Sequence, residues 1–206
     1  MRNPNRQAEK RRALDKEQEK SDTLIVYDSK HGSTEQYAKW LADILDCDAM
    51  PYVKNKLGIM SVYQNIIYGG WIQASDITGL NLVLNNYNNF NLGGKNLYVF
   101  STGLGDYSDE SYVKLLREYN YIDKLPEDHY YPLPGRFNRD KLNMSGRAML
   151  KAYGDKVFDG LSDHQRELIK TRMDEGYDGV QIEALKPLVD EICRLRAMVM
   201  ETGMSR

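Results

Sequence analysis

The sequence has little of what disulfide-stabilised, metal-binding or membrane-spanning proteins require. Its 206 residues include only two cysteines, Cys47 and Cys193, which lie far apart and form no C-x-x-C pair. This spacing argues against a redox dithiol, a zinc site and a disulfide framework, so we expect no metal. Apolar runs are far shorter than the roughly 20 residues that a membrane-spanning helix requires, and the charged N-terminus lacks the apolar region of a secretory signal. We therefore predict a cytoplasmic protein whose redox chemistry, if any, comes from a cofactor.

A strong net charge is also absent, since the formal net charge is −2. Residues 1–20 hold seven basic and four acidic residues, which leaves 21 basic and 26 acidic residues beyond them and a net charge of −5 for that part. This disfavours a nucleic-acid partner. Residues 1–21 have too few apolar side chains to pack on a core, so we predict a charged, flexible tail followed by one domain at 22–200. Contact of the tail with a membrane surface stays open.

Strand and helix patterns alternate along the domain. Near-continuous apolar runs with β-branched residues predict buried parallel strands at 23–27, 49–53, 65–68, 96–101 and 129–133. Between them, apolar residues at helical spacing predict covering helices, with a capping box of Ser33 and Gln36 at the start of the first. This alternation is typical of a three-layer α/β fold with a parallel sheet between helices. The predicted helical faces are Tyr37–Ala38–Leu41–Ile44–Leu45, Leu80–Val83–Leu84–Tyr87 and Tyr112–Val113–Leu116–Tyr119.

The C-terminal part departs from this alternation. Leu185, Leu188, Val189, Ile192 and Leu195 predict a last helix, with Pro187 near its first turn. Residues 136–177 precede that helix and are predicted to be an insertion with helices at about 141–153 and 163–174. The asparagine-rich residues 81–96 predict a short, poor helix mixed with turns.

Ligands of open parallel sheets collect at the carboxyl ends of the strands, and the first of these ends suggests a phosphate site. Helix N–H groups and hydroxyls could bind a phosphate there, and Gly32 would let the backbone turn around it. An ordinary turn and helix cap is the alternative, and His31 could be a plain loop residue. The residues of this loop are Ser29, Lys30, His31, Gly32, Ser33 and Thr34.

Two later strand ends are candidates for the same site. Gly69, Gly70, Trp71 and Ile72 combine a flexible glycine pair with an aromatic face for stacking, although Trp71 could equally be a core residue. The other segment consists of Thr102, Gly103, Leu104, Gly105, Asp106 and Tyr107. Ser108 replaces the third glycine of a dinucleotide fingerprint, which disfavours a Rossmann NAD site. No turn has the lysine of a Walker A loop, so phosphoryl transfer is disfavoured too.

Residues 24–41 resemble the first strand, phosphate loop and first helix of flavodoxin-like proteins, with His31 in place of the middle threonine of T/S-x-T-G-x-T. Residues 66–80 and 131–142 are similar to the flavodoxin-domain branch that includes menaquinone-dependent protoporphyrinogen dehydrogenase. The resemblance implies a doubly wound, five-stranded parallel sheet of order 2-1-3-4-5. It also implies FMN, with its phosphate at residues 29–34 and its ring between the two later loops. Trp71 and Tyr107 would stack on the ring, and a carbonyl of Gly69 or Gly70 would face it.

Three functions stay open after this comparison. An electron carrier would exchange electrons with redox partner proteins and would need no catalytic acid, base or nucleophile. A dehydrogenase would oxidise a substrate such as protoporphyrinogen with quinone as acceptor. That branch usually carries R-G-G-F where this chain has Pro134, Gly135, Arg136 and Phe137, so quinone reduction is open. An FMN-free protein-binding module is the third.

Overall fold

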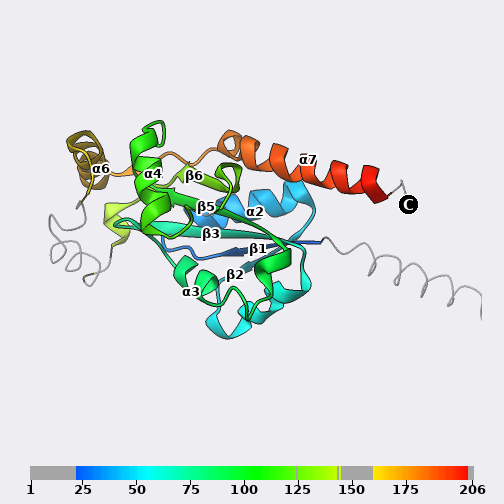
Figure 1. Cartoon of the computed structure of the whole chain (residues 1–206). Coiled ribbons are helices and arrows are strands. Elements are labelled where there is room, and N and C mark those ends of the chain that lie inside the picture. Colours follow the sequence, from blue (N-terminus) through cyan, green and yellow to red (C-terminus); the bar gives the residue numbers. More distant parts are fainter. Residues whose placement is uncertain (1–21, 124, 143, 145–159, 204–206) are drawn as a thin grey trace, which may run out of the picture.

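A parallel β-sheet forms the centre of the protein (Figure 1). The computed structural model describes residues 22–203 except 124, 143 and 145–159. Strands run in the order β2-β1-β3-β5-β6, which confirms the predicted order 2-1-3-4-5 once the parallel strands alone are numbered. An additional short strand, β4 (Asp76–Ile77), pairs antiparallel with β3 and was not predicted. The parallel strands are β1 (Thr23–Tyr27), β2 (Asp48–Pro51), β3 (Asn65–Gln73), β5 (Asn96–Gly103) and β6 (Tyr130–Pro134).

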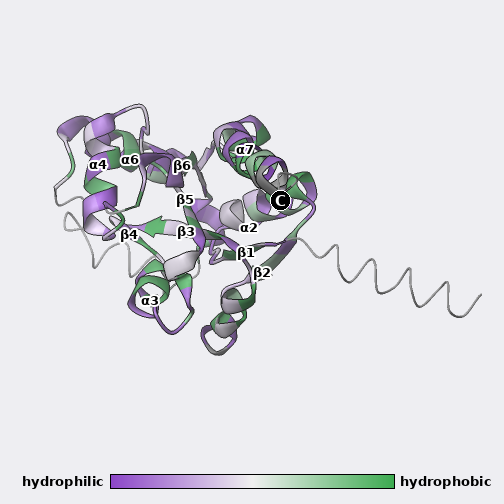
Figure 2. Cartoon of the chain, turned by 45° about the vertical axis from the view of Figure 1, so that its right-hand side comes forward, coloured by the Kyte–Doolittle hydropathy of each residue, from purple (hydrophilic) through white to green (hydrophobic). Residues whose placement is uncertain are grey.

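Helices cover both faces of the sheet and separate two cores. Because successive side chains of a strand point to opposite faces, Ile25 packs with helices α2 (Ser33–Leu45) and α7 (Lys186–Gly203). Val26 packs on the other face with α3 (Leu80–Asn85) and α4 (Glu110–Tyr119). Figure 2 shows α2 and α7 on one side of the strands and α3 on the other. The predicted three-layer arrangement is therefore confirmed.

Several predicted details were wrong at the edges of elements. Tyr119 was assigned to the buried face of its helix but is 57% exposed, because α4 ends there. Leu185 is buried but belongs to the short helix η6 (Ile182–Leu185) that precedes α7, whereas Pro187 lies in the first turn of α7 as predicted. The nine-residue 3-10 helix η1 (Lys54–Val62) after β2 was missed, since its apolar residues follow no regular helical period.

The asparagine-rich region and the insertion are only partly regular. Residues 81–96 form most of α3, turns, the short helix η2 (Leu92–Gly94) and the first residue of β5, so the predicted mixture of a short helix and turns is confirmed. The predicted helix at 163–174 is α6 (Asp163–Glu175). The predicted tail at 1–21 lies outside the described residues. So does most of the predicted helix at 141–153, of which residues 141, 142 and 144 are described. Other short elements are η3 (Glu127–His129), β7 (Arg136–Phe137), η4 (Arg139–Lys141) and β8 (Tyr177–Asp178).

The described helices include none that is both long enough and apolar enough to cross a bilayer. The longest, α7, runs from Lys186 to Gly203 and carries charged residues along its length.

A glycine in the centre of the sheet provides a test of this packing. A Cβ on Gly69 would lie 2.2 Å from Cζ of the fully buried Phe100 on the neighbouring strand. Since the ring cannot yield inside a packed core, we expect Gly69→Ala to lower the free energy of unfolding by about 1–3 kcal/mol in urea denaturation. Gly58→Ala is the control, because nothing lies within 4 Å of its Cβ position. Equal stability of the two variants would contradict this packing.

Candidate functional site

The loop after β1 has the form of an anion-binding site. Gly32 adopts φ +85° and occupies the N-cap position of α2, where no side chain caps the helix. The free N–H groups of the first turn therefore point out of the helix end, which carries the positive end of the helix dipole. Ser29 Oγ is buried beside this turn and has no hydrogen-bond partner among the described residues. A buried hydroxyl without a partner is costly, so the loop is suited to an acceptor such as a phosphate oxygen.

The predicted capping box at the start of α2 is wrong. Ser33 lies inside the helix rather than at its cap, and its Oγ donates to Thr102 Oγ1 over 3.2 Å. Gln36 instead accepts a hydrogen bond from Arg136 Nη2 at 3.1 Å. Both side chains therefore bind residues far away in the chain and do not cap α2.

Hydroxyl groups join the first loop to the end of β5. Thr34 Oγ1 and Thr102 Oγ1 lie 2.8 Å apart, and the Ser33 hydroxyl completes the cluster. All three residues are buried, and Thr102 lies almost seventy positions after the other two in the chain. The structure therefore brings the first and third predicted segments together.

The second predicted segment is part of a strand rather than a loop. Gly69, Gly70, Trp71 and Ile72 all belong to β3, and neither glycine has a positive φ. The glycine pair is needed for space instead of conformational freedom, since Cβ atoms there would collide with Phe100 and with Ile77 of β4. The Gly69 carbonyl, one of the two predicted to face the flavin ring, already accepts a hydrogen bond from the Asp28 N–H at 2.8 Å.

The β3–β4 hairpin that follows is held by a residue the sequence analysis missed. Asn120, at the end of α4, accepts the Ile77 N–H at 2.7 Å and donates to the carbonyl oxygens of Ser75 and Leu116. It is 6% exposed, so these bonds satisfy a buried amide. Nothing in the local pattern distinguished Asn120 from the surface asparagines of 81–96.

Trp71 lies at the first loop. Lys30 Nζ sits 4.9 Å from the centroid of its indole, and the His31 ring meets it edge-on at 6.1 Å. His31 also contacts Phe137 of β7, with the ring centroids 5.5 Å apart. Trp71 belongs to neither core cluster among the described residues, which favours the interpretation of an aromatic face at the site over that of a core tryptophan.

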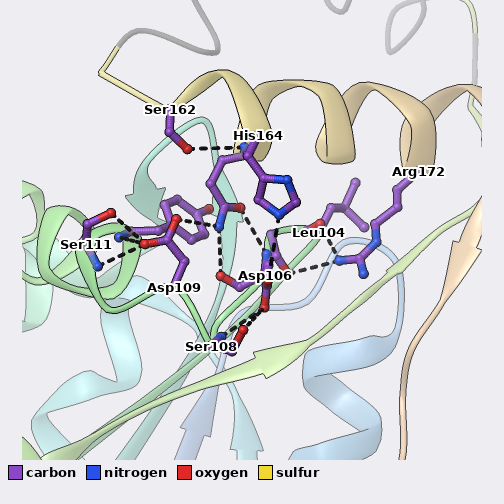
Figure 3. Close-up of polar contacts among 11 residues, drawn as sticks. Leu104, Asp106, Ser108, Asp109, Ser111, Ser162, His164 and Arg172 are labelled. Atoms are coloured by element: carbon purple, nitrogen blue, oxygen red, sulfur yellow. Dashed lines mark hydrogen bonds and ion pairs between the residues drawn. The ribbon is translucent and has the colours of Figure 1, made fainter.

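The third segment is held in place by α6. Gln165 accepts the Asp106 N–H at 3.0 Å and donates to the Asp106 carbonyl at 2.9 Å. Arg172 donates to the carbonyl oxygens of Leu104 and Gly105 at 2.7 and 2.9 Å, while its guanidinium lies 4.2 Å from the Tyr177 ring centroid. Figure 3 shows His164 and Arg172 reaching from α6 toward Asp106 and Leu104. The insertion therefore fixes the backbone of this loop.

Carboxylates at the outer side of this loop bind neighbouring hydroxyls and amides. The Ser108 hydroxyl and N–H lower the pKa of Asp106, and His164 lies 3.8 Å from its carboxylate. Asp109 caps α4, and hydrogen bonds led by that of the Ser111 hydroxyl lower its pKa to about 2. Both carboxylates are therefore ionised at neutral pH and serve to shape the loop.

Tyr107 points toward the core. Its ring lies nearly parallel to that of Tyr112, with the centroids 5.9 Å apart. Burial raises the pKa of Tyr107 well above its usual range. The Tyr107 hydroxyl lies so close to Gly103 that a Cβ there would be 2.5 Å away. The structure thus does not bring Tyr107 into contact with Trp71.

Arg136 is the charged residue that the sequence analysis left out of the site. Its Nη1 lies 4.0 Å from the position that a Cβ on Gly32 would occupy, at the N-terminal end of α2. Arg136 belongs to the two-residue strand β7, about a hundred positions after α2 begins, so no local sequence pattern could predict that it lies there.

Among the described parts of the chain, no group of three or more potential metal ligands occurs.

The fold and the converging strand ends define a doubly wound α/β protein with an uncapped helix N-terminus after its first strand. A family model described as a flavodoxin domain matches residues 24–156, more than half of the chain. The chain therefore belongs to the flavodoxin domain family, and this membership implies flavin binding. The match does not distinguish the protoporphyrinogen dehydrogenase branch from other members.

Solved structures resemble the chain at low sequence identity. The Trp repressor binding protein from Bacillus subtilis is 16% identical with a TM-score of 0.43, and the match covers 65% of this chain and 96% of that chain. Oxidised flavodoxin 1 from Bacillus cereus is 16% identical with a TM-score of 0.34, covering 68% and 99%. The flavodiiron protein from Giardia intestinalis is 15% identical with a TM-score of 0.38, covering 78% and 39%. These scores are too low to add to the family assignment. Curated proteins gave no match.

The role of Arg172 can be tested on the loop that it holds. Arg172→Leu removes both hydrogen bonds to the carbonyl oxygens of residues 104 and 105, so we expect amide hydrogen exchange at 104–107 to become about tenfold faster. Exchange in β1 and β3 should stay unchanged. Thr171→Ala, at an exposed position of the same helix, is the control. Unchanged exchange in the Arg172 variant would show that the loop is held by other contacts.

His31 should make stability depend on pH. Burial, followed by the charge of Lys30, lowers the pKa of His31 below its usual 6.5, so the folded state favours the neutral ring. The stability that this gives is complete above pH 6.5 and is lost as the pH falls through the lowered pKa. We expect His31→Gln to lose less stability than the parent chain between pH 7.5 and pH 5 in urea denaturation. An equal loss in both proteins would mean that His31 does not contribute.

Proposed function

We propose that this chain binds FMN at the carboxyl ends of β1, β3 and β5 and carries electrons between redox partners. The observation that carries the proposal is the unpaired, buried Ser29 hydroxyl at the uncapped N-terminus of α2. Membership of the flavodoxin domain family supports it. FMN, when bound, would supply the electron chemistry, since it can take up and return electrons.

Each strand end has a part in this proposal. Residues 29–34 would hold the phosphate through N–H groups and hydroxyls. The ring would lie between residues 69–72 and 102–107, with Trp71 as its aromatic neighbour. Tyr107 could stack on the ring only after leaving its place against Tyr112. We also propose that residues 22–200 form the unit that folds around the cofactor.

The remaining features tune such a site rather than perform acid–base chemistry. The contacts of α6 would keep the loop at residues 102–107 rigid. The hydroxyl cluster of Ser33, Thr34 and Thr102 would exclude water from the space between the first loop and β5. The acidic charge of residues 21–206 would disfavour the accumulation of negative charge on the cofactor. Electron transfer needs no nucleophile at the site.

A substitution in the phosphate loop tests the proposal. The purified protein should show flavin absorption bands, alone or after incubation with FMN. Ser33→Asp places a carboxylate beside the phosphate, and this repulsion should raise the Kd for FMN by roughly 100-fold or more. Because Ser33 is buried, folding of the variant is verified by circular dichroism before its FMN affinity is measured.

Ser33→Asn is the matched control, since it has the same shape without the charge. It should retain FMN within about tenfold of the parent affinity. A colourless protein that ignores added FMN would reject the proposal in favour of a binding module. Undiminished FMN affinity in Ser33→Asp would place the phosphate elsewhere.

A further inference from the structure

Arg136 is fixed at the end of the sheet by backbone pairing. Strand β7 pairs antiparallel with β8, so that Arg136 lies opposite Asp178. The adjacent Gly135 donates its N–H to the Gly103 carbonyl at 2.7 Å and accepts the Gly179 N–H at 3.0 Å. The backbone that carries Arg136 is thus attached to the carboxyl end of β5.

Two contacts then aim the side chain. Nε donates to Asp178 Oδ2 at 2.8 Å, and Nη2 donates to Gln36 Oε1 at 3.1 Å. Neither contact uses Nη1, which faces Gly32 at the first turn of α2. The Arg136 side chain is 30% exposed, so it is partly desolvated but reachable by a ligand.

The electrostatics of this position are unfavourable without an anion. A helix N-terminus carries a partial positive charge, and cations are stabilised at the opposite end of a helix. Here the guanidinium and Lys30 both lie at the N-terminal end of α2, whereas Glu35 of the first turn pairs with Lys39 at 2.7 Å. Asp178 compensates only one of the two cations. A bound phosphate would compensate the positive charge that remains.

We propose that Arg136 is a phosphate ligand of the FMN site, through Nη1, and makes the site selective for phosphorylated over unphosphorylated flavin. The inference rests on the proposed function. A guanidinium hydrogen bond to a phosphate is among the stronger polar contacts of proteins, and riboflavin lacks the phosphate that would accept it.

The experiment compares FMN and riboflavin binding to the full chain and to Arg136→Gln by flavin fluorescence quenching at low and high salt. The Kd for FMN should rise about tenfold in the variant, while the Kd for riboflavin stays the same. The salt dependence of FMN binding should also become weaker, because one charge contact is lost. Arg136→Lys keeps the charge but loses the planar fork, so its Kd for FMN should lie between those of the parent chain and Arg136→Gln. It serves as the test if Arg136→Gln folds poorly.

Arg139→Gln is the control, since Arg139 is exposed and pairs with Asp174 rather than with the loop. It should bind both flavins as the parent chain does. Equal weakening of FMN and riboflavin in Arg136→Gln would show that Arg136 only braces β7 and would overturn the inference. So would an unchanged Kd for FMN. Failure of the parent chain to bind FMN would instead reject the proposed function, and the inference with it.

Discussion

Parallel pairing of β1, β3 and β5 is the constraint on which the rest of the structure depends. The register aligns Tyr27 with Gly69 and Gly69 with Phe100, so the carboxyl ends of the three strands lie at the same edge of the sheet. Such close pairing is possible because Gly69 leaves room for the Phe100 ring. The hydroxyl contacts of Thr34 with Thr102 follow from this alignment, as does the meeting of Trp71 with Lys30 and His31.

The insertion between β6 and α7 adds a second set of constraints at the same edge. Helix α6 binds the backbone of the third loop through Gln165 and Arg172, and β8 directs the side chain of Arg136 through Asp178. Both effects come from residues that follow the three strand-end segments 29–34, 69–72 and 102–107 in the chain. The insertion thereby completes a site whose other parts lie in the common α/β scaffold.

Local patterns predicted those features that depend on neighbours in the chain. The strand at 23–27 and the helix after it follow from an apolar run and from apolar residues at helical spacing. The capping box of Ser33 and Gln36 was wrong because Thr102 and Arg136 offered competing partners. The flexible loop expected at Gly69 and Gly70 was wrong because the small size of glycine, and not its freedom, was required there.

The sequence by itself determined the class of the fold, the order of the parallel strands and the loop that resembles a phosphate site. The fold class and the loop rest on hydrophobic periodicity and on short motifs, which are read within a few residues. The order of the strands came from the resemblance of those motifs to flavodoxin-like proteins. Only the tertiary structure decided that Ser29 is left unpaired, that Tyr107 faces the core and that Arg136 reaches the start of α2. Each of these features depends on residues that lie far away in the chain. Such residues come into contact only when the sheet and the insertion have folded.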